Sequence, residues 1–181
     1  HVTGVQTCAL PISIPTQWGR SPGNGSMVNA LAAAVGRTPT AVAGKPEVPL
    51  MKQSIERARS RRPLVVGDRL DTDILGANNV GIDSVLVLSG VTRVEELLRA
   101  RESERPTYLA WDASCLLDEQ PGVTVDGGAA TLAGWRAQAG ELTGTGDVLD
   151  AIRVACVGVW HGFLTFEQAG VALRARGVAV G

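Results

Sequence analysis

Three aspartates follow one apolar segment closely enough to form a cation site. The segment 63–67 reads Pro-Leu-Val-Val-Gly, and Asp68, Asp71 and Asp73 come directly after it. A continuous apolar run is typical of a strand buried in a parallel sheet, and open α/β sheets bind ligands at the carboxyl ends of such strands. Clustered carboxylates repel one another, and oxygen ligands without nearby His or Cys favour Mg²⁺. Spacing alone leaves a second interpretation open, in which one aspartate caps a helix and the others are solvated.

A lysine ends the preceding strand candidate, in the turn Gly44-Lys45-Pro46. If the neighbouring strands end at the same edge, Lys45 lies close to the acidic loop, where its charge would offset the carboxylates and bind phosphate oxygens. The chain uses arginine at every other basic position except Lys52. A surface lysine in a turn is the alternative, and Lys45 by itself does not exclude it.

These residues need a sheet to position them, and the sequence predicts one. Apolar strands alternate with amphipathic helices, which indicates a doubly wound α/β fold with a Rossmann-like parallel sheet. The sheet is short of strands, as expected of an incomplete domain. The predicted strands are 38–44, 63–67, 83–90 and 107–111, and the predicted helices are 26–35, 48–59, 74–81 and 93–100, with a helical turn at 112–117 and loop or strand end at 14–25.

Composition narrows the class of protein. The 181 residues are 45% apolar and 19% charged, with a formal net charge of −1. No apolar run approaches the roughly 18 residues that a membrane span requires, and no basic stripe indicates nucleic-acid binding. Three widely spaced cysteines form neither a disulfide framework nor a zinc site. We therefore expect a cytoplasmic globular protein.

The first twelve residues are expected not to belong to the natural protein. The chain starts with His1 rather than Met, and residues 2–12 resemble one reading frame of a sequencing-library adapter. Segments of this kind are set aside before the fold is considered. A genuine N-terminal strand is the alternative.

Residues 119–181 are expected to form a small helical appendage of unreadable role. A boundary is placed near 119–121, and the glycine-rich stretch 122–146 is interpreted as turns. Two helices are predicted after it, at 147–160 and 165–177.

The lysine turn, the acidic loop and the flanking strands together resemble the haloacid dehalogenase (HAD) superfamily, subfamily IIA, over residues 14–117. The resemblance implies a Rossmann-like core with a cap domain inserted before the lysine motif. Residues 13–39 would be the end of that cap, and residues 40–118 the C-terminal half of the core. It further implies that Lys45 contacts the phosphoryl group and the nucleophile, that Asp68 binds Mg²⁺, and that Asp73 supports the metal site. Asp71 matches a variable position.

The family's reaction also needs an aspartate nucleophile and a second aspartate two residues later, and neither is found. Asp71 and Asp73 have this spacing but lie inside the metal loop. The segment 123–128, Val-Thr-Val-Asp-Gly-Gly, carries Thr124 at the nucleophile's place and follows the other motifs instead of preceding them. The nucleophile is therefore expected upstream of this chain. The chain alone would be inactive and weakly folded, since it lacks strands to cover Val65, Val66, Val85 and Val87.

The expected function is that of a Mg²⁺-dependent phosphatase that hydrolyses small phosphomonoesters through an aspartyl-phosphate. The expected partner is a small phosphorylated metabolite, with no nucleic acid or membrane, and the cap is the surface through which a homo-oligomer would form. A non-catalytic HAD-like binding or regulatory protein is the alternative. A response-regulator-like domain is disfavoured because Lys45 precedes Asp68 in the chain.

Other candidates have ordinary structural interpretations. The loop 22–26 is expected to be a turn and helix cap rather than a phosphate cradle, and the arginines at 57–62 a solvated helix end. His161 is expected to be packed or on the surface, and Cys156 to be a small buried hydrophobe.

Overall fold

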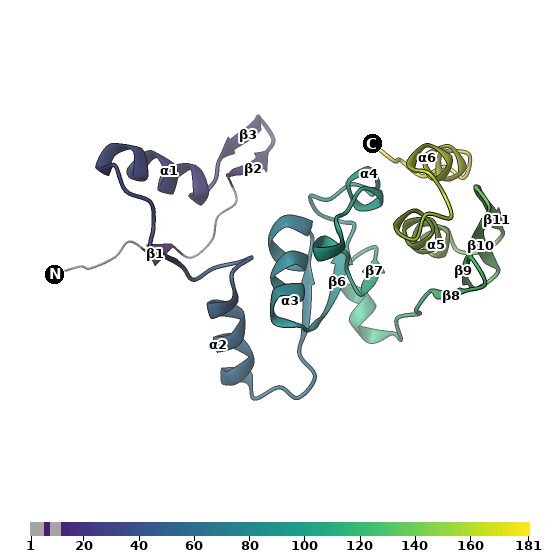
Figure 1. Ribbon diagram of the computed structural model, residues 1–181, viewed down its shortest axis with the longest axis horizontal. Coiled ribbons are helices and arrows are strands. Elements are labelled where there is room, and N and C mark those ends of the chain that lie inside the picture. The colour runs from purple at the N-terminus through teal and green to yellow at the C-terminus, as the bar shows by residue number, and fades with distance from the viewer. Residues whose placement is uncertain (1–5, 8–11) are drawn as a thin grey trace.

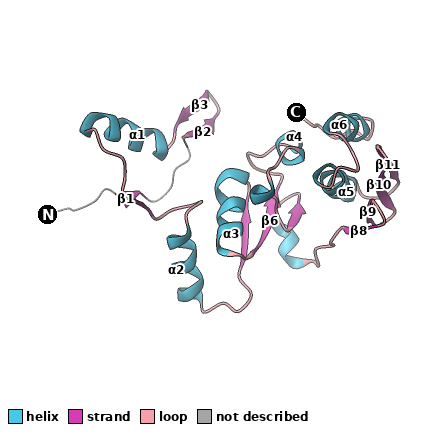
Figure 2. Cartoon of the chain, viewed as in Figure 1, coloured by secondary structure: helices cyan, strands magenta, loops and turns pink. Residues whose placement is uncertain are grey.

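The computed structural model describes residues 6–7 and 12–181 (Figure 1). Helices and strands alternate through the middle of the chain, and a run of short strands followed by two helices completes it (Figure 2). The strands are β1 (Gln6–Thr7), β2 (Ser13–Thr16), β3 (Gly19–Pro22), β4 (Ala41–Val42), β5 (Leu64–Gly67), β6 (Asp83–Val87), β7 (Tyr108–Ala110), β8 (Thr124–Asp126), β9 (Ala129–Leu132), β10 (Trp135–Gln138) and β11 (Glu141–Gly144). The helices are α1 (Asn24–Val35), α2 (Val48–Ala58), α3 (Leu75–Val80), α4 (Val94–Leu98), α5 (Val148–Trp160) and α6 (Phe166–Arg174), with single turns η1 (Leu70–Ile74), η2 (Glu102–Glu104) and η3 (Ala113–Leu117).

A parallel sheet in the order β5-β6-β7 forms the centre of the fold. Val66 pairs with Val85, and Val85 pairs with Tyr108. The prediction of an α/β fold with an incomplete Rossmann-like sheet is confirmed. Strand β6 ends at Val87 rather than at the predicted residue 90, because the chain turns there into the loop that contacts Asp68.

The two faces of this sheet are covered differently. Leu86 and Leu109 belong to a large buried cluster that includes residues of α4, α5 and α6. Side chains alternate along a strand, so Val85 and Val87 point to the other face, where Ala110, Tyr108 and Cys115 surround them. Val85 and Val87 are 0% and 9% exposed. The expectation that these two valines would lack cover is wrong, because the turn η3 folds back beside them.

The outer edge of β5 is open among the described residues, since β5 pairs with β6 alone. Leu64 and Val66 are 42% and 36% exposed. The exposure of Val66 agrees with the expectation that no strand covers it, and the exposure of Leu64 departs from the burial that the apolar run predicts. The predicted strand 38–44 is reduced to β4, which lies outside the central sheet and pairs with β1.

The N-terminal part of the described chain is a hairpin followed by a helix. Strands β2 and β3 pair antiparallel where a loop was predicted, and α1 begins at Asn24, two residues before the predicted helix. Figure 1 shows the hairpin and α1 apart from the central sheet. Of the twelve residues interpreted as a leader, residues 1–5 and 8–11 lie outside the described part of the chain. Gln6 and Thr7 form the short strand β1, in line with the alternative interpretation of this segment as an N-terminal strand.

The glycine-rich stretch 122–146 forms a four-stranded antiparallel sheet, in the order β11-β10-β9-β8. The interpretation of this stretch as turns is wrong. Each pair of neighbouring strands is joined by two residues that both have positive φ, as type I′ hairpin turns require. These pairs are Gly127 and Gly128, Ala133 and Gly134, and Ala139 and Gly140. The glycines thus mark the ends of strands that are each only three or four residues long.

Helices α5 and α6 confirm the two helices predicted near the end of the chain. Asp147 caps α5 by accepting a hydrogen bond from the Leu149 N–H at 2.7 Å, and Thr165 and Gln168 form a capping box at the start of α6.

The segment 121–181, hereafter the C-terminal module, shares its core with the central sheet. Its residues Ile152, Val154 and Leu173 belong to the same buried cluster as Leu86 and Leu97. The Arg153 guanidinium donates to the Leu109 carbonyl at 2.6 and 3.1 Å, at the end of the sheet. With its antiparallel sheet and two helices, the module is α+β rather than purely helical, and it covers one face of the central sheet. None of the helices described is long and apolar enough to cross a membrane.

Candidate active site

Asp68 lies at the carboxyl end of β5 and is held by the loop that follows β6. The Val91 N–H donates to Oδ2 of Asp68 at 2.8 Å, and the Thr92 N–H donates to the Asp68 carbonyl at 3.0 Å. The Asp68 side chain is half-buried. Two neighbouring strand ends therefore fix the position of one carboxylate.

Asp73 lies in the turn η1, immediately before α3, and is 5% exposed. Its Oδ1 forms an ion pair with the Lys45 ammonium, and its Oδ2 accepts the Arg69 N–H at 3.2 Å. A buried carboxylate needs such partners because desolvation penalises its charge. The structure thus brings Lys45 to the acidic loop, although β4, the strand before it, pairs with β1 outside the central sheet.

Lys45 is presented by a turn that neighbouring elements hold in place. The Leu50 N–H donates to the Ala43 carbonyl at 2.9 Å, and the Asn79 side chain on α3 donates to the Pro46 carbonyl at 2.9 Å. The Lys45 side chain is 44% exposed, whereas its partner Asp73 is 7% exposed. The ammonium is therefore oriented by a buried carboxylate while it still faces solvent, where a ligand can reach it.

The carboxylate of Asp71 pairs with Arg69 rather than with Lys45. Its two carboxylate oxygens accept hydrogen bonds from the Arg69 guanidinium at 3.0 and 2.7 Å, and its side chain is 57% exposed. The hydrogen bond to Asp71 raises the pKa of the Arg69 guanidinium above its ordinary value. This bidentate pair supports the exclusion of Asp71 from the metal ligands.

Two glycines make room for the aspartates, and the sequence analysis overlooked both. A Cβ atom at Gly90 would lie 2.2 Å from Oδ2 of Asp68, and a Cβ atom at Gly67 would lie 2.3 Å from Cβ of Asp73. No side chain fits in either space. Their signal in the sequence is a glycine at the end of each apolar strand, next to the loop that carries chemistry.

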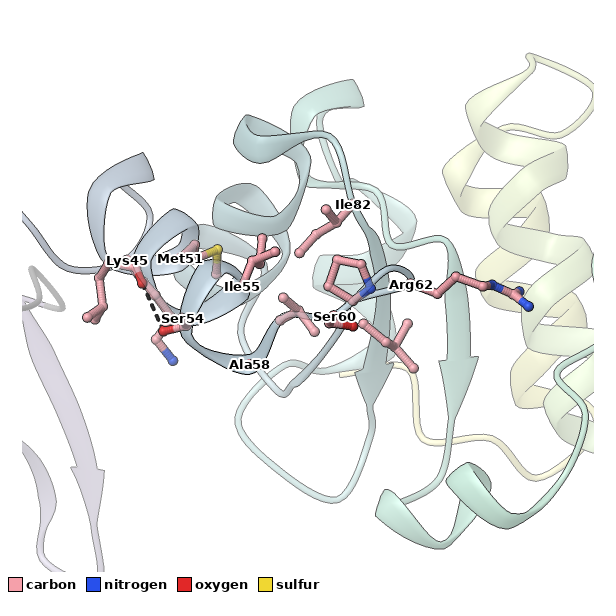
Figure 3. Close-up of a pocket in the computed structure, with 12 residues that line it drawn as sticks. Lys45, Met51, Ser54, Ile55, Ala58, Ser60, Arg62 and Ile82 are labelled. Carbon is pink, nitrogen blue, oxygen red and sulfur yellow. Dashed lines mark hydrogen bonds between the residues drawn. The ribbon is translucent and has the colours of Figure 1, made fainter.

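An apolar groove of about 440 Å³ lies between α2 and the β5 edge, with Lys45 at one end (Figure 3). Its lining includes Met51 and Ile55 from α2, Leu64 from β5, and Ile82, which precedes β6. Apart from Lys45, none of the candidate site residues lines it. The groove therefore extends the open edge of β5 rather than forming a pocket around the aspartates.

The remaining sequence candidates lie away from this site. His161 stacks on Phe163, with ring centroids 5.7 Å apart. Cys156 is 1% exposed, and burial raises the pKa of its thiol, so it does not act as a nucleophile. Asp126 lies on the edge strand β8 of the C-terminal module. No group of three or more His, Cys, Asp or Glu able to hold a metal occurs within the described residues.

The chain is similar to a known protein family and to named relatives. Residues 42–114 match the model of the HAD-hydrolase-like family. The chain is 41% identical, over 159 residues, to the D-glycerol 3-phosphate phosphatase of Mycobacterium tuberculosis, covering 82% of this chain and 44% of that protein. It is 36% identical, over 110 residues, to an acid sugar phosphatase of Staphylococcus haemolyticus, covering 60% of this chain and 41% of that protein.

A solved structure of a phosphatase is also similar to most of this chain. The crystal structure of a glycerol phosphate phosphatase from Mycobacterium tuberculosis, in complex with magnesium, matches with a TM-score of 0.73 and 36% identity. The match covers 92% of this chain and 53% of that one, and so extends over the C-terminal module. Residues 42–114 thus form a domain of the haloacid dehalogenase superfamily, and the relatives that the chain resembles are subfamily IIA phosphatases. The chain spans about half the length of the curated relatives it matches.

Proposed function

We propose that this chain is the C-terminal part of a Mg²⁺-dependent phosphatase that hydrolyses small phosphomonoesters through an aspartyl-phosphate. The observation that carries the proposal is the Lys45–Asp73 ion pair at the same sheet edge as Asp68. The names of the relatives support it, since they include phosphatases of glycerol phosphate and of sugar phosphates.

Lys45 would bind the phosphoryl group and the nucleophile. Asp73 holds the ammonium through one carboxylate oxygen, and the backbone of Arg69 holds the other. Phosphoryl transfer needs positive charge at fixed positions around the transferring group, because negative charge is spread over its three equatorial oxygens. Lys45 meets that need, because the buried Asp73 orients its ammonium while the side chain remains accessible to a ligand.

Asp68 would be one ligand of the metal. Mg²⁺ keeps several waters and is commonly bound by one or two carboxylates together with substrate phosphate, so it does not require three protein ligands from this chain. The half-buried carboxylate of Asp68 is an oxygen donor at a strand end, and it fits that ligand set. When bound, Mg²⁺ would neutralise charge on the phosphoryl oxygens.

The nucleophile would come from a strand that pairs with the open edge of β5. The backbone of Leu64–Gly67 is free to pair on that side among the described residues, and Leu64 and Val66 are exposed there. A parallel strand at this edge would end beside Asp68, because the carboxyl ends of parallel strands meet at one edge. About half of each relative lies outside its match to this chain, and that sequence is long enough to supply such a strand.

Residues 13–39 would be the end of the inserted cap. Trp18 on the hairpin is 90% exposed, and Leu31 and Val35 of α1 are 62% and 60% exposed. Apolar surface on this scale needs a cover, which the rest of the cap would supply, and a homo-oligomer would form through the same domain. A cytoplasmic location is part of the proposal, and it is compatible with Cys115 and Cys156 being free thiols.

The experiment uses the full-length gene product and compares two aspartates of one loop. We expect Mg²⁺-dependent release of phosphate from small phosphomonoesters, and we expect Asp68→Ala to lower it by about a hundredfold or more. Asp71→Ala is the control, because Asp71 is exposed and bound to Arg69. Absence of Mg²⁺-dependent activity, or its survival in Asp68→Ala, would overturn the proposal and favour a non-catalytic binding protein.

A further inference from the structure

The last five described residues, Gly177 to Gly181, run back from α6 to the start of α4, and we call them the C-terminal strap. Figure 1 shows the end of the chain beside α4 and α6. The Val180 carbonyl accepts a hydrogen bond from the Glu95 N–H at 2.7 Å. The Val180 side chain is 2% exposed and belongs to the large buried cluster, as does Val94.

The strap meets α4 at Glu95, whose N–H donates to the Val180 carbonyl and whose carboxylate lies beside Gly181. A cavity of about 490 Å³ lies between the strap and the loop after β6, and its lining includes Leu88, Thr92 and Trp111. Gly177, Val178, Ala179 and Gly181 also line this cavity, whereas Val180 does not. Val178 and Val180 are both buried in the large cluster, at 8% and 2% exposed, but Val178 also lines the cavity and Val180 does not.

The two residues Val91 and Thr92, just before the start of α4, bind Asp68 through their backbone N–H groups. The first N–H groups of a helix have no partner within the helix. In α4 the Arg93 N–H is satisfied by the Glu96 carboxylate at 2.9 Å, and the Glu95 N–H by Val180. Thr92 immediately precedes this turn and is 4% exposed. Its N–H, together with that of Val91, holds Asp68.

Because α4 has only one and a half turns, its own hydrogen bonds fix its first residues weakly. We propose that Val180 is a positioning residue for Asp68, acting through the first turn of α4 and the amides of Val91 and Thr92. The C-terminal module thus reaches the candidate active site without contributing a group to it. The part of this inference that concerns metal affinity rests on the proposed function.

The test uses the full-length gene product and two readouts. The first is hydrogen exchange of the Val91 and Thr92 amides in the metal-free protein. The second is binding of Mn²⁺, a spectroscopic substitute for Mg²⁺, followed by electron paramagnetic resonance. We expect Val180→Ala to speed exchange of both amides by about tenfold and to weaken Mn²⁺ binding by about tenfold. Val180→Ile, which keeps the buried contact, should restore both.

The control is Leu142→Ala on β11. Leu142 is 5% exposed in the same cluster, its side chain is larger than that of Val180, and the main contacts of β11 are with β10, α5 and α6. An equal effect of Leu142→Ala on the two amides, or no effect of Val180→Ala on them, would overturn the proposal. If Val180→Ala does not fold, Val180→Thr makes the same test with the side-chain shape retained.

The two proposals fail differently. If Asp68→Ala binds Mn²⁺ as tightly as the unmodified protein, Asp68 is not a metal ligand and the proposed function fails. The exchange of the Val91 and Thr92 amides would still report whether Val180 holds the loop.

Discussion

Two helices of nearly equal length meet the rest of the molecule in opposite ways. Helix α1 leaves Met27, Leu31 and Val35 between 57% and 62% exposed, whereas α5 buries Ile152 and Val154 completely. Helix α5 packs against α4, α6, strand β7 of the central sheet and strands β9 to β11 of the C-terminal module. The C-terminal module therefore packs within the described part of this chain, whereas in our proposal α1 packs against the rest of the cap.

The open edge of β5 repeats this contrast within the central sheet. Strand β6, flanked on both sides, buries Val85, Leu86 and Val87, whereas β5 leaves Leu64 and Val66 exposed. Both exposed surfaces precede residue 68 in the chain, and both lie on the side where the relatives carry additional sequence in our proposal. The open edge of β5 lies next to the candidate active site, because Asp68 directly follows that strand.

The largest change in the free energy of unfolding is expected at Trp135, and we compare it with the change at Trp18. Trp135 is 4% exposed, and its Nε1 donates to the Asp147 carbonyl at 3.0 Å. We expect Trp135→Ala to lower the free energy of unfolding of the full-length gene product by about 3–5 kcal/mol, measured by urea denaturation. Trp18→Ala should cost less, about 1–2 kcal/mol, if the rest of the cap covers that side chain.

Equal costs at the two positions would break the comparison between the two halves. A cost within about 0.5 kcal/mol for Trp18→Ala is the value for an exposed residue. That result would mean that nothing covers the hairpin, and it would contradict the interpretation of residues 13–39 as part of a cap.

A smaller effect, on the rate of phosphate release, is expected at Gly90, and we compare it with the effect at Gly122. Gly90→Ala places a methyl group where Asp68 now lies, so the carboxylate or the loop must move. We expect the rate of Mg²⁺-dependent phosphate release to fall by about tenfold to a hundredfold. Gly122→Ala is the control, since a Cβ atom there meets nothing within 4 Å. Unchanged activity in Gly90→Ala would show that the position of Asp68 is not critical.

The sequence was sufficient to predict the parallel strands and the meeting of Lys45 with the acidic loop. The parallel strands follow from a strong local pattern, the continuous apolar run. Lys45 does lie at the acidic loop, but the strand before it, β4, pairs with β1 outside the central sheet. The expected reason, that neighbouring parallel strands end at one edge, therefore does not explain this contact. The assignment of roles to Lys45, Asp68 and Asp73 rested on a family resemblance, because spacing alone left capping and solvated interpretations open.

The sheet of the C-terminal module was missed for a physical reason. Its strands are too short for alternation to be visible, and the glycines that form its turns also resemble a loose linker. The useful signal was the regular return of a two-residue turn, at Gly127-Gly128, Ala133-Gly134 and Ala139-Gly140.

The burial of Val85 and Val87 was missed because their cover is not another strand. Cys115 in the turn η3 packs beside them, and nothing in a single-turn helix indicates which face of a sheet it will meet. Gly90 was missed because a glycine acquires meaning only when its neighbour in space is known, and Asp68 is 22 residues away in the chain.

The most direct test of the account compares the two lysines of the chain. Lys45 pairs with the buried Asp73 at the candidate active site, whereas Lys52 is exposed on α2. In the full-length gene product, we predict that Lys45→Met lowers kcat/KM for a small phosphomonoester by about a hundredfold or more. Lys52→Met should change it by no more than about twofold. Equal activities of the two variants would contradict the assignment of phosphoryl binding to Lys45.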